Sequence, residues 1–336
     1  MNIQKSENQT NFKEILSTIQ NSKQKALQQV NITLIELYWS IGKYISTKTI
    51  KENWGKSVVT ELAMFIEQKE PTLKGFSDKN LWRMKQFYET YYKNEKLSAL
   101  LRELSWTNNL MIMSSSKSEE EREYYIALSI HERYSSRELE RQIKSSLFER
   151  TMLANKKLSP VLRELPQDTK NIFRDVYVLD ILGLTKQHKE KDLQSSILSS
   201  LKAFILEVGK DFCFMGQEYR LQVGNSDFSI DLLFYHRTLQ CMIAFELKID
   251  DFKPAYLGQL EFYLEALDKD VKKEYENPSI GILLCRKKDD EVVKYALNRS
   301  LSPTVISEYE TKLIPKEVLE QKLNELYEMY ELIEEK

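Results

Sequence analysis

Residues that break helices and form turns are scarce in this chain. Its 336 residues include only 9 glycines and 7 prolines. Because these two residue types most often interrupt regular structure, we expect long helices joined by short loops. The length predicts about two domains, each large enough to bury a core of its own.

Cysteine is also rare. Cys213, Cys241 and Cys285 form no CxxC pair and are odd in number, so they offer no paired-thiol motif and no complete set of disulfides. All three lie in apolar, strand-like segments. We therefore predict buried free thiols in a reducing cytosol.

Long apolar runs and a strong net charge are absent as well. No apolar run approaches the roughly 20 residues of a membrane span, and residues 1–7 are polar, without the apolar region of a signal peptide. A cytoplasmic protein is the expectation. The formal net charge is only −2, so binding to nucleic acid would depend on local basic patches.

The first part of the chain has the periodicity of helices. Apolar residues recur at spacings of three and four from Phe12 to Ile45, and Gly42 within this run predicts a close helix contact. A second helix is expected over Lys56–Glu70, and Ser77 is a good N-cap for a third that runs to Tyr91. We predict an all-helical domain over residues 1–155.

The second and third of these helices have the spacing of a helix-turn-helix. In that arrangement Lys79, Arg83 and Gln86 would face a nucleic-acid groove. A role in protein interaction or dimerisation is the alternative, and the helical domain is a candidate surface for homo-oligomer formation.

The pattern changes after a bridge at residues 156–187, which contains Pro160, Pro166 and Gly183. Residues 188–336 alternate strand and helix signals, in the order α-β-β-β-α-β-α-β. The expected elements are Asp192–Leu206, Glu218–Val223, Phe228–His236, Leu239–Ile249, Pro254–Asp268, Ser279–Cys285, Glu291–Asn298 and Thr304–Glu308. This order predicts an α/β domain.

Charged residues interrupt two of the apolar strands. Asp231 lies in the first, and Glu246 and Lys248 lie two residues apart in the second, so their side chains share a face. Such groups are costly to bury unless they pair or hold a metal. A structural ion pair on a half-exposed sheet is one interpretation.

A metal site is the other interpretation. Mg²⁺ prefers carboxylate and carbonyl oxygens, which Asp231, Glu246 and the Leu247 carbonyl would supply. Hydrolysis of a phosphodiester needs an activated water and a neutralised negative charge. Lys248 would orient or help to deprotonate that water and stabilise the developing charge.

The arrangement of Asp231 on one strand and Glu246-x-Lys248 on the next resembles the PD-(D/E)XK nuclease superfamily. Gln259 and Tyr263 in the following helix match the Gln-x-x-x-Tyr motif of its RecB-like branch, and one helical turn places them on the same face. The resemblance implies a restriction-endonuclease-like αβββαβ core with a mixed sheet. It also implies Mg²⁺ (or Mn²⁺), and support from Gln259 and Tyr263 at the phosphate or the metal.

Longer segments resemble the YhcG-type nucleases over nearly the whole chain. They are Asp231–His236, Phe245–Lys248, Phe252–Gln259, Leu37–Trp39, Gly75–Ser77 with Asn80-Leu81, Leu104–Trp106 and Leu147–Arg150. The resemblance implies a metal-dependent nuclease, with DNA favoured over RNA as substrate. The alternative is a non-catalytic nucleic-acid-binding or scaffold protein that keeps the fold.

One position departs from the superfamily pattern. Many members carry a further glutamate on the helix before the first strand, where this chain has Gln194. Glu190 or Asp192 could take its place, or the site could lack that ligand.

Overall fold

A computed structural model describes residues 2–154, 158–159, 162, 172–184, 188–209 and 211–334, with side chains from 12 to 328 within these ranges. The chain divides into two compact units, Met1–Glu140 and Arg141–Lys336. Much of the predicted bridge at 156–187 lies outside the described residues. The predicted domain limits (1–155 and 188–336) stay a prediction. The first unit ends before residue 155 because α8 (Leu147–Met152) packs against α15 (Lys316–Glu334) in the second.

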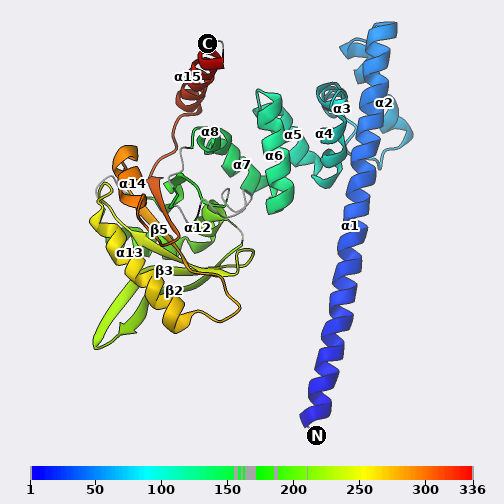
Figure 1. The fold of residues 1–336 in the computed structure, drawn as a ribbon. Helices are drawn as coiled ribbons and strands as arrows, with labels where there is room; N and C mark the ends of the chain where they lie inside the picture. Colours follow the sequence, from blue (N-terminus) through cyan, green and yellow to red (C-terminus); the bar gives the residue numbers. More distant parts are fainter. Residues whose placement is uncertain are drawn as a thin grey trace. The chain divides into compact units, whose positions relative to one another are not determined.

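The first unit is helical in the described residues, as predicted. Its elements are α1 (Asn2–Glu52), α2 (Lys56–Lys69), α3 (Asp78–Tyr91), α4 (Glu95–Leu100), the 3-10 turn η1 (Leu101–Glu103), α5 (Trp106–Ser115) and α6 (Glu119–Glu132); α7 (Ser136–Lys144) crosses the boundary into the second unit (Figure 1).

The core of the first unit forms where α1 packs against α3. A Cβ atom on Gly42 would come within 2.1 Å of the Met84 carbonyl oxygen, so the predicted close helix contact is confirmed. Trp39 packs edge-to-face on Phe87 with ring centroids 5.8 Å apart. The early part of α1 is different, because its apolar side chains (Phe12, Ile15, Leu16, Ile19, Leu27 and Val30) are exposed.

The second unit is built on a six-stranded mixed sheet. Its strands are β1 (Val176–Val178), β2 (Phe212–Val223), β3 (Ser226–His236), β4 (Cys241–Leu247), β5 (Ile280–Cys285) and β6 (Thr304–Glu310). The spatial order is β1-β6-β5-β4-β3-β2. Strands β2, β3 and β4 pair antiparallel, whereas β4, β5, β6 and β1 pair in parallel. The predicted αβββαβ core is therefore present.

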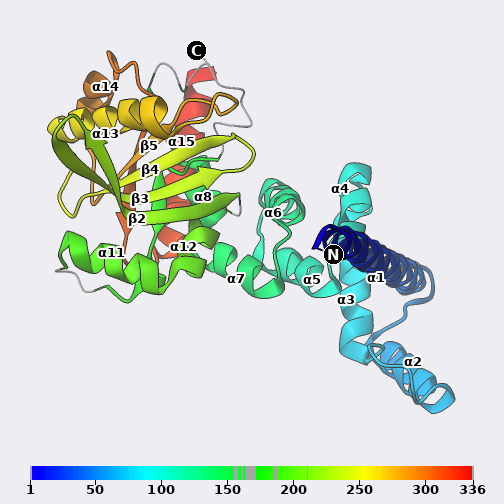
Figure 2. The ribbon, with the colours of Figure 1, turned by 90° about the horizontal axis from the view of Figure 1, so that it is seen from below.

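Helices cover both faces of this sheet (Figure 2). On one side lie α11 (Glu190–Ser199) and α12 (Leu201–Val208), and on the other α13 (Ala255–Ala266) and α14 (Asp290–Leu297). The predicted helix Asp192–Leu206 is thus interrupted at Ser200. Strand β1 was not predicted, because three residues are too few to show a period of two. The chain also forms a 3-10 turn (Asp180–Leu182) and a π-helical turn (Leu267–Val271).

The cysteine prediction is confirmed for two residues and wrong for one. All three thiols are free; Cys241 and Cys285 are buried, and Cys213 is exposed. Cys213 lies on the edge strand β2, where alternate side chains point away from the core. Among the described residues, none of the helices has the length and apolar character needed to cross a membrane.

Candidate active site

The two candidate metal-binding carboxylates lie at the same end of one strand pair. Strands β3 and β4 pair from His236 opposite Cys241 to Leu232 opposite Phe245. Asp231 and Glu246 are the next residue on each strand, so the antiparallel register brings them together. All residues of β4 are buried, which explains why its sequence is apolar up to the glutamate.

Glu246 is a buried carboxylate, and only one of its two oxygens has a hydrogen-bond partner. The residue is 2% exposed. Its Oε1 accepts a hydrogen bond from Lys248 Nζ at 2.9 Å, while its buried Oε2 has no hydrogen-bond partner. Burial, reinforced by the negative charge of Asp231, raises the pKa of Glu246 to about 7, although Lys248 opposes the shift.

Asp231 holds the end of the neighbouring strand in place. Its Oδ2 accepts a hydrogen bond from the Leu247 backbone N–H at 2.8 Å. Burial raises the pKa of Asp231, and the charges of Glu190 and Glu218 act in the same direction. Two close carboxylates with raised pKa values are the electrostatic condition that a bound cation would relieve.

Lys248 lies among acidic groups and an aromatic ring. Besides Glu246, its Nζ lies 3.7 Å from Glu190 Oε2 and 5.4 Å from the centre of the Tyr256 ring. Burial works against the charged amine. However, the hydrogen bond to Glu246 and the nearby carboxylates outweigh burial and raise the pKa of Lys248.

Three residues at the start of α11, Glu190, Asp192 and Gln194, have different roles in the structure, although the sequence did not show which of them belongs to the site. Asp192 Oδ2 accepts the Lys189 backbone N–H at 2.9 Å, so it caps the start of the helix. Gln194 Nε2 donates to the Asp231 carbonyl at 3.1 Å. Glu190 is the residue of this turn whose carboxylate reaches Lys248.

Gln259 and Tyr263 pair with each other on α13, as their spacing predicts. Gln259 Nε2 donates to the Tyr263 hydroxyl at 2.7 Å. Tyr263 is buried, and burial together with the charges of Glu246 and Asp231 raises the pKa of its hydroxyl, against the effect of Gln259. The tyrosine is therefore neutral at physiological pH and lies within electrostatic reach of the carboxylates.

Sequence reasoning missed two neighbours of the site. Glu218 lies across from Asp231, because Gln217 pairs with Leu232 and Tyr219 with Ile230; Tyr256 lies against Lys248. The register of the β2–β3 hairpin could have located Glu218. Tyr256 belongs to the segment Phe252–Gln259 that resembles the YhcG-type nucleases, but its contact with Lys248 was not predicted.

The oxygen atoms available suit a hard divalent cation. No group of three or more His, Cys, Asp or Glu side chains with metal-holding geometry occurs in the part of the chain that the structure describes. The groups of this site that could hold a metal are the Asp231 and Glu246 carboxylates, with the Leu247 carbonyl as the expected third ligand. The unpaired, buried Oε2 of Glu246 fits this assignment, because a buried carboxylate oxygen without a donor is otherwise costly.

One known protein is similar to this chain over most of its length, including both of its parts. A curated relative from Escherichia coli (strain K12), "Putative nuclease YhcG", is 28% identical over an alignment that covers 89% of each chain. Two solved structures match part of the chain. A repair endonuclease from Pyrococcus abyssi matches with 16% identity and a TM-score of 0.26, covering 39% of this chain and 50% of that one.

The second structure, the EndoMS–dsDNA complex, matches with 17% identity and a TM-score of 0.27, covering 38% of this chain and 46% of that one. The chain thus spans about half the length of each of these two matched chains. Among family models, residues 14–150 match the DUF1016 N-terminal domain and residues 170–324 match the YhcG PDDEXK nuclease domain. The two parts of the chain are therefore similar to a DUF1016 N-terminal domain and to a YhcG PDDEXK nuclease domain, respectively.

Proposed function

We propose that this protein is a metal-dependent nuclease that hydrolyses the phosphodiester backbone of nucleic acid, with DNA favoured over RNA. The observation that carries the proposal is the buried Glu246, whose second oxygen is unpaired beside Asp231 and Lys248. The YhcG PDDEXK domain match over residues 170–324 supports the same chemistry.

Asp231, Glu246 and the Leu247 carbonyl would hold Mg²⁺, with Mn²⁺ as a substitute of similar coordination preference. When bound, the ion supplies an activated water and a positive charge at the phosphate. The hydrogen bond from the Leu247 N–H fixes Asp231, and the bond from Gln194 fixes the backbone on which Asp231 sits. These two contacts preorganise the carboxylates before the substrate arrives.

Lys248 acts as a cation in this proposal. Against the effect of burial, the hydrogen bond to Glu246 and the nearby carboxylates raise the pKa of Lys248, which favours the protonated amine. It would donate hydrogen bonds to the attacking water or to a phosphate oxygen and stabilise negative charge that develops there. Glu190, 3.7 Å away, would hold the amine in this position.

Gln259 and Tyr263 would position the substrate. Both side chains offer hydrogen-bond donors, and their mutual bond orients them from one face of α13 next to the acidic groups. We assign them to contact with the scissile phosphate or to support of Glu246.

A non-catalytic protein that keeps the nuclease fold is the alternative, because the Lys248–Glu246 pair would also satisfy a purely structural role. The test is cleavage of linear, circular and single-stranded DNA and of RNA in Mg²⁺, Mn²⁺ or EDTA. Wild type is compared with Asp231→Asn, Lys248→Ala and the matched control Lys269→Ala, an exposed lysine that pairs with Glu265 at 2.8 Å.

We expect metal-dependent cleavage by wild type and Lys269→Ala, and loss of cleavage in Asp231→Asn and Lys248→Ala with unchanged circular dichroism. Asp231→Ala should lose cleavage too. Full activity in any of the three site variants would refute the site assignment. Binding of nucleic acid by wild type without cleavage of any substrate would favour the non-catalytic alternative.

A further inference from the structure

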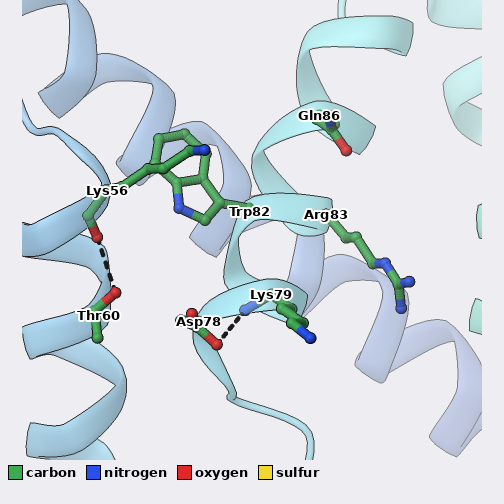
Figure 3. Close-up of a pocket in the computed structure, with 7 residues that line it drawn as sticks. All are labelled: Lys56, Thr60, Asp78, Lys79, Trp82, Arg83 and Gln86. Atoms are coloured by element: carbon green, nitrogen blue, oxygen red, sulfur yellow. Dashed lines mark hydrogen bonds between the residues drawn. The ribbon is translucent and has the colours of Figure 1, made fainter.

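A cleft lies between α2 and α3 in the Met1–Glu140 unit, whereas the residues assigned to catalysis belong to the Arg141–Lys336 unit. Its volume is about 510 Å³, which is large enough for a nucleotide. Its lining residues are Lys56, Thr60, Asp78, Lys79, Trp82, Arg83 and Gln86 (Figure 3). The cleft includes the three residues that the helix-turn-helix interpretation placed toward nucleic acid, Lys79, Arg83 and Gln86.

The lining carries an excess of positive charge. It contains three exposed cations, Lys56, Lys79 and Arg83, against one carboxylate, Asp78. Within the described part of the chain, none of the three cations makes an ion pair. Asp78 Oδ1 accepts the Lys79 backbone N–H at 2.7 Å, so its charge is directed to the helix end. The cleft therefore suits an anion.

The N-terminus of α2 adds to this potential, whereas that of α3 is already capped, because the Ser77 side chain accepts the Asn80 N–H. Lys56 is the first residue of α2, and Lys79 is the second residue of α3. The N-terminal end of a helix carries partial positive charge and attracts anions. The N-cap of α2 is Gly55, which has no side chain to satisfy the first N–H groups.

Trp82, like Tyr88, is not among the buried aromatic residues of α3. Phe87 and Tyr91 are fully buried in the core, whereas Trp82 is partly exposed and projects from α3 toward Lys56 and the cleft (Figure 3). The Lys85 amine lies 5.3 Å from the centre of its ring. An accessible indole beside cations is the combination that binds unpaired bases, by stacking, and their phosphates, by charge.

We propose that this cleft binds single-stranded nucleic acid. One base stacks on Trp82, Lys56, Lys79 and Arg83 contact the flanking phosphates, and Gln86 hydrogen-bonds the edge of the base. A duplex is read by a convex helix that enters a groove, whereas a concave cleft between two helices admits a single strand. The site would deliver or retain an unpaired strand, and it does not depend on the proposed nuclease chemistry.

The test measures binding without cleavage. The full-length protein is titrated in EDTA into labelled 12-nucleotide single strands of DNA and of RNA and into a duplex of the same DNA sequence, followed by fluorescence anisotropy. We expect the single strands to bind more tightly than the duplex. The two single-stranded probes establish whether DNA or RNA is preferred.

Three variants separate the charge and stacking contributions. Lys56→Ala/Lys79→Ala/Arg83→Ala should weaken binding at least tenfold and reduce the slope of log K against log salt by about 2, as expected for three lost phosphate contacts on a single strand. Trp82→Ala should weaken binding about 5- to 150-fold with little change in that slope. Trp82→Phe should retain part of the affinity.

The matched control is Lys69→Ala/Lys93→Ala/Lys96→Ala, which removes three exposed cations of the same unit that do not line the cleft. Near-wild-type binding by this control supports the cleft. Equal losses in both triple variants would indicate non-specific attraction and overturn the proposal. Tighter binding of the duplex through the same residues would overturn it in favour of groove reading. Because no metal is present, none of these outcomes bears on the Asp231–Glu246 site.

Discussion

Replacing Glu246 with glutamine should remove a pH-dependent loss of stability from the Arg141–Lys336 unit. Burial raises the pKa of this carboxyl from 4.5 to about 7 in the folded protein. Each pKa unit corresponds to about 1.4 kcal/mol, so the folded state disfavours the ionised form by about 3 kcal/mol. Glutamine keeps the shape of the side chain and has no proton to lose.

The sign follows from which state loses the proton first. Below pH 4.5 the carboxyl is protonated in both states and costs nothing. Between pH 4.5 and 7 the unfolded chain ionises first, so the folded state loses stability, and above pH 7 the loss levels off. In EDTA, the unfolding free energy of wild type should therefore fall by about 2 to 3 kcal/mol more than that of Glu246→Gln between pH 5 and 8.

The assay must follow the second unit alone. All four tryptophans, Trp39, Trp54, Trp82 and Trp106, lie in the first unit, so tryptophan fluorescence would not report on it. Hydrogen exchange of the β4 and β5 amides in a urea series, read by mass spectrometry, gives the local unfolding free energy at each pH.

Two comparisons make this prediction refutable. Glu265→Gln, which changes an exposed carboxylate, should follow the pH dependence of wild type. Mg²⁺ at pH 8 should restore stability to wild type but not to Glu246→Gln, because the ion binds the ionised carboxylate. Parallel pH curves for wild type and Glu246→Gln would show that the raised pKa does not affect the stability of the fold.

Three further perturbations test the surrounding structure. Gly42→Ala should destabilise the first unit by about 1 to 3 kcal/mol, because the new methyl group would meet the Met84 carbonyl. Tryptophan fluorescence in urea measures this loss. An unchanged unfolding free energy would contradict the tight α1–α3 contact. Gln194→Leu removes the hydrogen bond to the Asp231 carbonyl, and the unfolding free energy of the second unit should fall by about 1 kcal/mol. The variant should also bind Mg²⁺ more weakly in calorimetry. Unchanged Mg²⁺ binding would mean that this hydrogen bond does not position Asp231. Ile15 and Ile19 are among the exposed apolar side chains of the early part of α1. If wild type forms a homo-oligomer through these side chains, Ile15→Glu/Ile19→Glu should be a monomer in light scattering. A monomeric wild type would exclude self-association through them.

Local patterns in the sequence predicted most of the elements and the candidate residues of the central site, but they missed β1 and the break between α11 and α12. Glu246, in β4, and Lys248, just after the end of β4, share one side because residues two apart on an extended chain point the same way. Gln259 and Tyr263 meet because four residues make about one helical turn. The order of helices and strands after residue 188 followed from apolar runs and turn residues. Gly42 was informative for a similar reason, since a glycine within a strongly periodic helix signals a close neighbour.

Tertiary structure decided everything that depends on residues far apart in the chain. The choice among Glu190, Asp192 and Gln194 required the position of α11 against Lys248 and Asp231, and Glu218 joined the site only through the register of the hairpin. The raised pKa of Glu246 comes from burial in the sheet. The identity of each residue, its periodicity and its spacing are local and can be read along the chain. Distance, burial and charge at a site are collective, because they arise only when separate segments pack together.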